Sequence, residues 1–182
     1  MTTFEIRQFG DPVLRQRARE VTELDGELAR LAETMIATMH EAHGVGLAAP
    51  QIGVQKRLYT YDVEELAERG AAAAGPGVLV NPEIVDADGE SVYEEGCLSV
   101  PGLHFDIVRP ERVTVRGLDL DGHEVILSSD DFMARVMQHE IDHLDGILVL
   151  DRLDVDARRA ALRELRTRDF DAAAPAGGAH RL

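Results

Sequence analysis

The chain has 182 residues, of which 45% are hydrophobic and 29% charged, a balance typical of a single globular domain. It carries 34 acidic residues against 19 basic ones, for a net charge of −15, and no apolar run approaches the roughly 18 residues of a membrane-spanning helix. These values exclude a membrane protein and argue against specific DNA binding or general nucleic-acid affinity. The N-terminus has neither a secretory nor a transit-peptide composition, so we expect a cytoplasmic protein.

The first half of the chain predicts one helix and a β-like segment. A turn with a short helical segment is expected at 10–18. Apolar residues at helical spacing predict a helix over 24–43, with Gly44 as its C-cap. Residues 53–63 have a β-like pattern, and the Ala-, Glu- and Gly-rich stretch 64–76 is typical of an exposed, mobile loop.

Short strands follow at small intervals, separated by turn residues. They are predicted at 78–80, 83–85, 103–108, 112–118 and 123–127. Asp121-Gly122 is a hairpin signal that joins the last two strands.

Two helices are predicted in the C-terminal third. Ser128 and Asp131 have the spacing of a capping box before a helix over 129–145, which should end at Gly146. A second helix is expected over 155–170.

The order of elements predicts an α+β fold. Mostly antiparallel strands should pack around the central helix 129–145, with an N-terminal and a C-terminal helix beside them. We treat residues 1–170 as one domain and expect 171–182 to be a disordered tail, because AAAPAGGAHRL lacks the apolar content to pack.

The strongest motif is His139-Glu140-Ile141-Asp142-His143, on the predicted central helix. Side chains four residues apart share one helix face, so His139 and His143 could hold the same metal ion. Glu140 would reach a water activated by that metal and accept its proton. Two chance histidines on a solvated helix would look the same, but the capped amphipathic helix favours a hydrolytic metal site.

A catalytic metal site needs a third protein ligand and one open position. No suitable residue follows the helix, and the remaining soft ligand is Cys97, the single cysteine of the chain, in EEGCLSVP. Gly96 would let the backbone approach closely there. A lone cysteine is often a buried small hydrophobe, whereas a thiolate beside two imidazoles would complete the site.

The segment 44–53, GVGLAAPQIG, is the third candidate. Its glycines superficially suggest a phosphate-binding loop, but it follows a helix and no GK[ST] ends it. The alternative is a tight loop packed against the metal, with Gln51 offering an amide donor to a polarised oxygen.

Together, GVGLAAPQIG, EGCLSVPG and QHEIDHLDG resemble the three signature motifs of the peptide deformylases, in the same order and with similar spacing. The opening IRQFGDPVLR resembles the start of the bacterial-type enzymes, and the resemblance covers roughly residues 4–154. It implies a metallohydrolase that removes the formyl group from the N-terminal methionine of nascent polypeptides and releases formate.

The resemblance also implies a ligand set. Cys97, His139 and His143 would bind one divalent metal ion, with Glu140 as general acid and base. The family's physiological metal is usually Fe²⁺, with Zn²⁺, Ni²⁺ or Co²⁺ as substitutes, and the sequence does not choose among them.

Other residues would hold the substrate. By resemblance, Gln51 and the backbone N–H of Leu98 would bind the formyl oxygen as it becomes an oxyanion, and the Gly46 carbonyl would accept the substrate's amide hydrogen. Substrate contacts are expected from Gly44, Val45, Gly96, Phe132 and Val136. Phe132 and Val136 precede His139 by seven and three residues on the same helix face, so they could be core residues, the wall of a methionine pocket, or both.

Supporting polar residues are harder to assign. Glu95 and Arg109 could form a buried pair that holds the cysteine segment rigid, or a solvated one. Asp142 is expected to make a supporting or capping hydrogen bond. The remaining histidines have no partner at ligand spacing and are treated as ordinary polar residues: His40, His43, His104, His123 and His180.

Three other functions share parts of this pattern. A zincin-type peptidase has the same helix motif but places its third ligand downstream. A structural metal module would need a fourth ligand, and the chain has no second cysteine. A blue-copper site uses two histidines and a cysteine, but not normally from one helix with a carboxylate between them.

The predicted last helix carries a local basic excess. Between residues 156 and 168 there are five arginines and two acidic residues, a net of +3. Arg159, Arg163 and Arg166 would form one stripe. An apolar side could dock on the body: Ala160, Ala161, Leu162 and Leu165. The stripe is either a solvated face or a weak, salt-dependent contact with ribosomal RNA near the nascent-chain exit.

Overall fold

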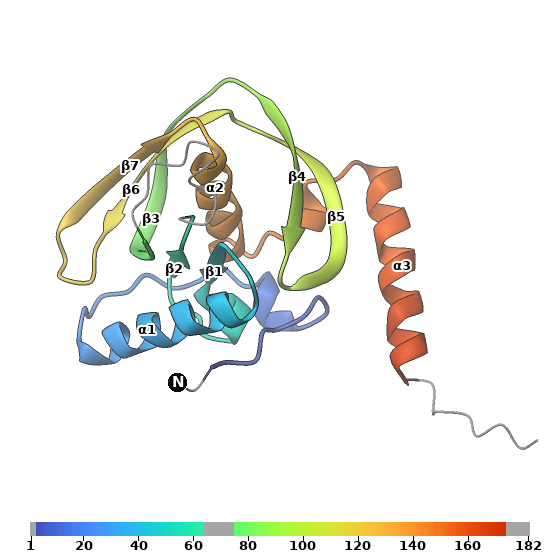
Figure 1. The fold of residues 1–182 in the computed structure, drawn as a ribbon, viewed down its shortest axis with the longest axis horizontal. Helices are drawn as coiled ribbons and strands as arrows, with labels where there is room; N and C mark the ends of the chain where they lie inside the picture. Colours follow the sequence, from blue (N-terminus) through green and yellow to red (C-terminus); the bar gives the residue numbers. More distant parts are fainter. Residues whose placement is uncertain (1–2, 64–74, 174–182) are drawn as a thin grey trace, which may run out of the picture.

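The computed structural model describes residues 3–63 and 75–173. A five-stranded antiparallel sheet lies with a helix on each face, and a two-stranded sheet stands beside it (Figure 1). The predicted α+β class, with antiparallel strands and three helices, is therefore confirmed. Most of the loop predicted at 64–76, and most of the predicted tail, lie outside the described residues.

The large sheet has the strand order β1-β2-β3-β6-β7. Its strands are β1 (Gly46–Ala48), β2 (Leu58–Tyr61), β3 (Gly77–Asp88), β6 (Arg112–Leu118) and β7 (Glu124–Ser129). Side chains alternate between its faces, as the pleat requires. The paired residues Leu58 and Val80 pack toward α1 (Gly26–Glu41), whereas Tyr59 and Leu79 pack toward α2 (Phe132–Leu144).

The end of α1 differs from the prediction. The helix ends at Glu41, and the left-handed residue after it is His43, with φ +54°, instead of Gly44. The Gly44 N–H closes the last turn by donating to the Met39 carbonyl at 2.9 Å. Gly44 also leaves room for Leu98, because a Cβ there would lie 2.8 Å from a methyl group at the end of that side chain.

The strands predicted at 78–80 and 83–85 are one strand, β3. A register shift between Val80 and Glu83 lets it continue past Asn81, which has φ +50°. The Asn81 side chain bonds both the N–H and the carbonyl of Val21 at 2.8 Å, which holds this irregular point. The β-like segment 53–63 contains the shorter strand β2, preceded by a turn.

α2 is the central helix, and it is buried on nearly all sides between the two sheets (Figure 1). The predicted capping box is wrong, since Asp131 itself is the N-cap and accepts from the Met133 N–H at 2.8 Å. Ser129 supplements it by accepting from the Ala134 N–H at 3.1 Å. The helix ends with Asp145 as C-cap, followed by Gly146 at φ +75°.

The two-stranded sheet consists of β4 (Ser91–Cys97) and β5 (Val100–Arg109). It begins well before the strand predicted at 103–108. α3 (Val155–Ala173) stands next to this hairpin, with Ala161, Leu162 and Leu165 in the core cluster that they share (Figure 1). The helix runs past the predicted end at 170, so residues 171–173 are helical and not part of a disordered tail. Ala160 is exposed, contrary to the prediction that it docks. Within the described residues, no helix is long and apolar enough to cross a membrane.

Candidate metal centre and active site

Cys97, His139 and His143 come together from two elements. Cys97 ends β4, where the register with β5 shifts between Gly96 and Cys97, and the two histidines lie on α2. The Cys97 Sγ is 3.2 Å from His143 Nε2, and the three ligand atoms all lie within 4.8 Å of one another. Cys97 and His143 are buried, so the cluster offers one soft sulfur and two imidazole nitrogens to a single ion.

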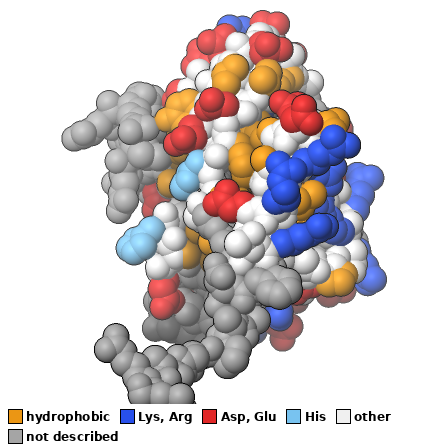
Figure 2. All heavy atoms as spheres, turned by 90° about the vertical axis from the view of Figure 1, so that its right-hand side faces the viewer, with side chains coloured by type: hydrophobic (Ala, Val, Ile, Leu, Met, Phe, Trp, Pro, Cys, Tyr) orange, Lys and Arg blue, Asp and Glu red, His pale blue; other side chains and the backbone are white. Residues whose placement is uncertain are grey.

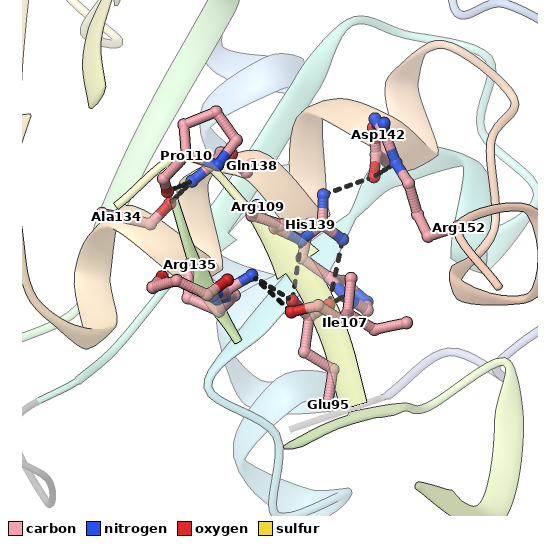
Figure 3. Close-up of polar contacts among 11 residues, drawn as sticks. Glu95, Ile107, Arg109, Pro110, Ala134, Arg135, Gln138, His139, Asp142 and Arg152 are labelled. Carbon is pink, nitrogen blue, oxygen red and sulfur yellow. Dashed lines mark hydrogen bonds and ion pairs between the residues drawn. The ribbon is translucent and has the colours of Figure 1, made fainter. Parts of the chain in front are cut away.

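Glu95 fixes the orientation of His139 (Figure 3). Its Oε2 lies 3.0 Å from His139 Nδ1, which leaves the other ring nitrogen for a metal. Arg109 holds the same carboxylate through two bonds of 2.7 and 2.9 Å, and Arg135 adds a third at 3.2 Å. Burial opposes ionisation, but the hydrogen bonds from His139 and Arg109 prevail and lower the pKa of Glu95 to about 2.

Asp142 extends this network along α2. Its Oδ2 accepts from Arg109 Nη1 at 2.6 Å and from Arg152 Nε at 3.0 Å, while Arg152 Nη2 bonds the other oxygen. Glu95 and Arg109 thus form a buried pair, and Asp142 has a supporting role. We name Glu95, Arg109, Arg135, His139 and Asp142 the buried ion-pair network. No sequence pattern had indicated Arg135 or Arg152 as partners in it.

Glu140 lies beside the cluster with almost no exposed surface. A Cβ on Gly46 would stand 2.3 Å from its Oε1, so the absence of a side chain at Gly46 makes room for this carboxylate. The Oε2 has no hydrogen-bond partner among the described residues. Burial is the main cause that raises the pKa of Glu140 to about 7.

The Gln51 amide has a fixed orientation. Its Oε1 accepts from the Ala48 N–H at 2.8 Å, so the Nε2 must point the other way, and it donates to Ser99 Oγ at 3.3 Å. Because Gln51 is 1% exposed, this donor is held in a dry setting next to the cysteine segment.

A cavity of about 380 Å³ opens over these groups. All the predicted catalytic and substrate residues line it, together with Cys97 and His139, while His143 lies deeper. The wall also contains residues that sequence reasoning missed: His43, Pro101, Leu103, His104 and Arg135. His104 is the register partner of Gly96, which only the strand pairing reveals.

The other histidines lie elsewhere. His40 pairs with Asp62 at 2.9 Å, and His123 with Asp119 at 3.3 Å. His180 lies outside the described residues.

One cysteine and two histidines beside the glutamate of an HExxH helix, inside an antiparallel α+β fold, could hold a metal ion as the site of a metal-dependent hydrolase does. The family model for polypeptide deformylase matches residues 3–159, and the chain belongs to this family. This assignment replaces the zincin, structural-metal and blue-copper alternatives.

Curated relatives and solved structures agree with the family assignment. A peptide deformylase from Thermodesulfovibrio yellowstonii is 43% identical over 168 residues, covering 92% of this chain and 99% of the relative. One from Halothermothrix orenii is 46% identical, covering 84% and 95%. The crystal structure of a peptide deformylase from Legionella pneumophila superposes with a TM-score of 0.84 at 40% identity, covering 96% of this chain and 100% of that one.

Proposed function

We propose that the cavity above Cys97 is where this chain hydrolyses the formyl amide, with Cys97, His139 and His143 holding one divalent metal ion. The family assignment makes the chain a metallohydrolase that removes the formyl group from the N-terminus of nascent polypeptides and releases formate. The observation that carries the assignment of the site is the clustering of the three ligand atoms within 4.8 Å, next to the buried Glu140.

The donor set fits the metals that the resemblance implies. One thiolate and two imidazoles suit Fe²⁺, which we propose as the physiological ion, and also Zn²⁺, Ni²⁺ or Co²⁺. When bound, such an ion polarises a carbonyl oxygen and lowers the pKa of a water molecule to near neutral pH. The hydrogen bond between Glu95 and His139 supports the assignment, because histidines that bind metals usually have such a partner.

Glu140 is proposed as the proton carrier. It would accept a proton from the attacking water and deliver it to the leaving amine. Burial raises the pKa of Glu140 in the metal-free chain, and this favours proton uptake by its carboxylate. The gap at Gly46 supports this role, because it lets Glu140 lie at the cavity wall.

Gln51 and the Leu98 N–H are proposed to donate to the formyl oxygen as it gains charge. The amide of Gln51 is already oriented by Ala48, and its Nε2 carries two hydrogens, so one can stay on Ser99 while the other is offered to the substrate. Donors fixed in advance in a water-poor site stabilise a developing oxyanion best.

The polypeptide is proposed to lie along β1. This strand is at the edge of the large sheet, so the Gly46 carbonyl can accept an amide hydrogen from an extended peptide. Val45, Phe132 and Val136 would then surround the methionine side chain, with Gly44 and Gly96 providing space for the backbone.

Location and a further partner follow from the substrate. An enzyme acting on nascent chains works where translation takes place, so we propose the cytoplasm. We also propose a weak ribosome contact through Arg159, Arg163 and Arg166, whose side chains are all exposed on α3. Lys and Arg side chains gather along one side of the face that carries α3 (Figure 2). The overall charge of −15 would limit binding to RNA in general.

The test is metal analysis and a formate-release assay on anaerobically purified protein. Formyl-Met-Ala-Ser should be hydrolysed with one metal ion per chain, and metal removal should abolish turnover. Unformylated Met-Ala-Ser is the control, and its cleavage would indicate a peptidase. Absence of formate release from metal-loaded protein would overturn the proposal.

A further inference from the structure

Arg152 is the outermost group bonded to the buried ion-pair network. It follows the 3₁₀ turn Val149–Asp151 and precedes α3 in the chain. Its guanidinium contacts both oxygens of Asp142, through Nε at 3.0 Å and through Nη2 (Figure 3). The Arg152 side chain is 42% exposed, whereas that of Asp142 is 9% exposed, so Arg152 reaches the network from its solvent side.

From Asp142 the hydrogen bonds continue without a break to His139. Arg109 Nη1 bonds Asp142, and Arg109 Nε and Nη2 bond Glu95. Glu95 in turn bonds His139 Nδ1 at 3.0 Å. Arg109 and Glu95 have side chains only 3% and 5% exposed, so water has little access to replace a hydrogen bond that breaks between them.

Arg109 and Arg152 share the carboxylate of Asp142. Arg109 divides its donors between two carboxylates, two bonds to Glu95 and one to Asp142. Among the described residues, Arg152 is the side chain that bonds Asp142 Oδ1. Without it, a buried carboxylate oxygen would lose its partner, and Asp142 would compete with Glu95 for Arg109.

We propose that Arg152 is a positioning residue for His139. Arg152 donates hydrogen bonds to Asp142, so Arg109 can keep both of its hydrogen bonds to Glu95. Glu95 then stays in place and keeps the His139 ring turned toward Cys97 and His143. Arg152 touches neither the substrate nor the ligand atoms, and it acts through three intervening side chains. The inference rests on the proposed ligand set.

The experiment measures how fast the enzyme releases its metal. Wild type, Arg152→Met and Arg152→Lys are loaded with Co²⁺ and mixed with excess chelator, and the visible spectrum follows metal loss. Residues that hold a metal ligand typically change metal affinity by about 10- to 100-fold, and Arg152 is further out, so we expect Arg152→Met to release metal about 3- to 10-fold faster. The cobalt spectrum should shift, and kcat should fall while KM stays the same. Arg152→Lys keeps the charge but loses the two-point contact, and should be intermediate.

Arg158→Met is the matched control. Arg158 is 46% exposed and pairs with Asp151 at 3.0 Å, close in the chain but outside the network, so its loss should leave release and spectrum unchanged. A second comparison uses Asp142→Asn. If Arg152 acts through Asp142, adding Arg152→Met to Asp142→Asn should cause little further change.

Arg152 is not a positioning residue if Arg152→Met releases metal as slowly as wild type and the control Arg158→Met. The same holds if Arg152→Met lowers the melting temperature while metal release and the cobalt spectrum stay unchanged. Should Arg152→Met fail to fold, Arg152→Lys must release metal faster than wild type for the proposal to stand. A Cys97→Ser variant that holds metal as tightly as wild type would overturn the ligand set, and this inference with it.

Discussion

Cys97 places the sulfur of the β4–β5 hairpin beside the two histidines of α2. Replacing it with serine removes the soft anionic ligand, because an alcohol stays protonated at neutral pH. We expect Cys97→Ser to lose its metal on dialysis and to release formate more slowly by at least about 100-fold, the upper range for residues that only support a ligand. Elemental analysis and the formate assay test this, and full metal content with full turnover would show that the assignment is wrong.

Gly46 provides a sharper test of the position of Glu140. A methyl group at Gly46 would stand 2.3 Å from Glu140 Oε1, so Gly46→Ala must displace the carboxylate. We expect metal content to be retained and turnover to fall toward that of Glu140→Gln, about 10²- to 10⁴-fold below wild type.

Gly26→Ala is the control for Gly46→Ala. A Cβ at Gly26 meets only the end of the Arg30 side chain, at 3.4 Å, so this change should leave turnover as it is. If Gly46→Ala is as active as wild type, the proposal that Glu140 carries the proton from its position at the cavity wall is wrong.

Single residues with distinctive chemistry were those the sequence could predict. Cys97, His139 and His143 stand out because few side chains bind metals, and α2 fixes the relation of the two histidines. Arg135 and Arg152 were missed because their partners depend on how the hairpin packs on α2. His43 and His104 were missed for the same reason, since they reach the cavity only through the fold.

At the scale of elements, regular patterns were predictable and short or irregular ones were not. β6 occupies the predicted residues. Its buried and more exposed residues alternate along the strand, and β6 is paired with a strand on each side. β1 was missed because a three-residue strand is too short to show alternation. β4 was missed because four of its seven residues are exposed, on a polar, Glu-containing stretch that resembles a loop.

The basic stripe on α3 is a property of that element. Changing Arg159, Arg163 and Arg166 to Glu reverses its charge, and phosphate contacts made by arginine weaken steeply with salt. We expect the triple variant to lose co-sedimentation with ribosomes at low salt, and wild type to lose it at moderate salt.

Deformylation of a free peptide should not change in the triple variant, because the three side chains are exposed and lie outside the cavity. Equal ribosome binding by both proteins would leave the stripe as ordinary solvated surface.

For the whole molecule, the metal should act as a cross-link. Its proposed ligands come from the small sheet and from the helix that covers the large sheet, so binding adds a further link between parts that already meet through side-chain packing and the buried ion-pair network. An ion that binds only the folded state at 100 times its Kd adds about 2.7 kcal/mol to the free energy of unfolding. We therefore expect chelation to lower the melting temperature of wild type.

Cys97→Ser should show a much smaller difference between its melting temperatures with and without chelator. Identical melting of metal-loaded and metal-free wild type would contradict the cross-link.

The position of β1 has a consequence for self-association. An exposed sheet edge can recruit the same edge of another copy, and long, flat edges are where proteins aggregate. β1 has three residues, and Pro50, which has no backbone N–H to donate, follows directly in the turn Ala49–Ile52. So short a strand offers a second copy few backbone hydrogen bonds. A peptide that also fills the cavity gains further contacts beyond the strand. All three residues of β1 are also buried, with Gly46 on the wall of the cavity, so the strand can be reached by a peptide in the cavity without presenting a long free edge to another copy.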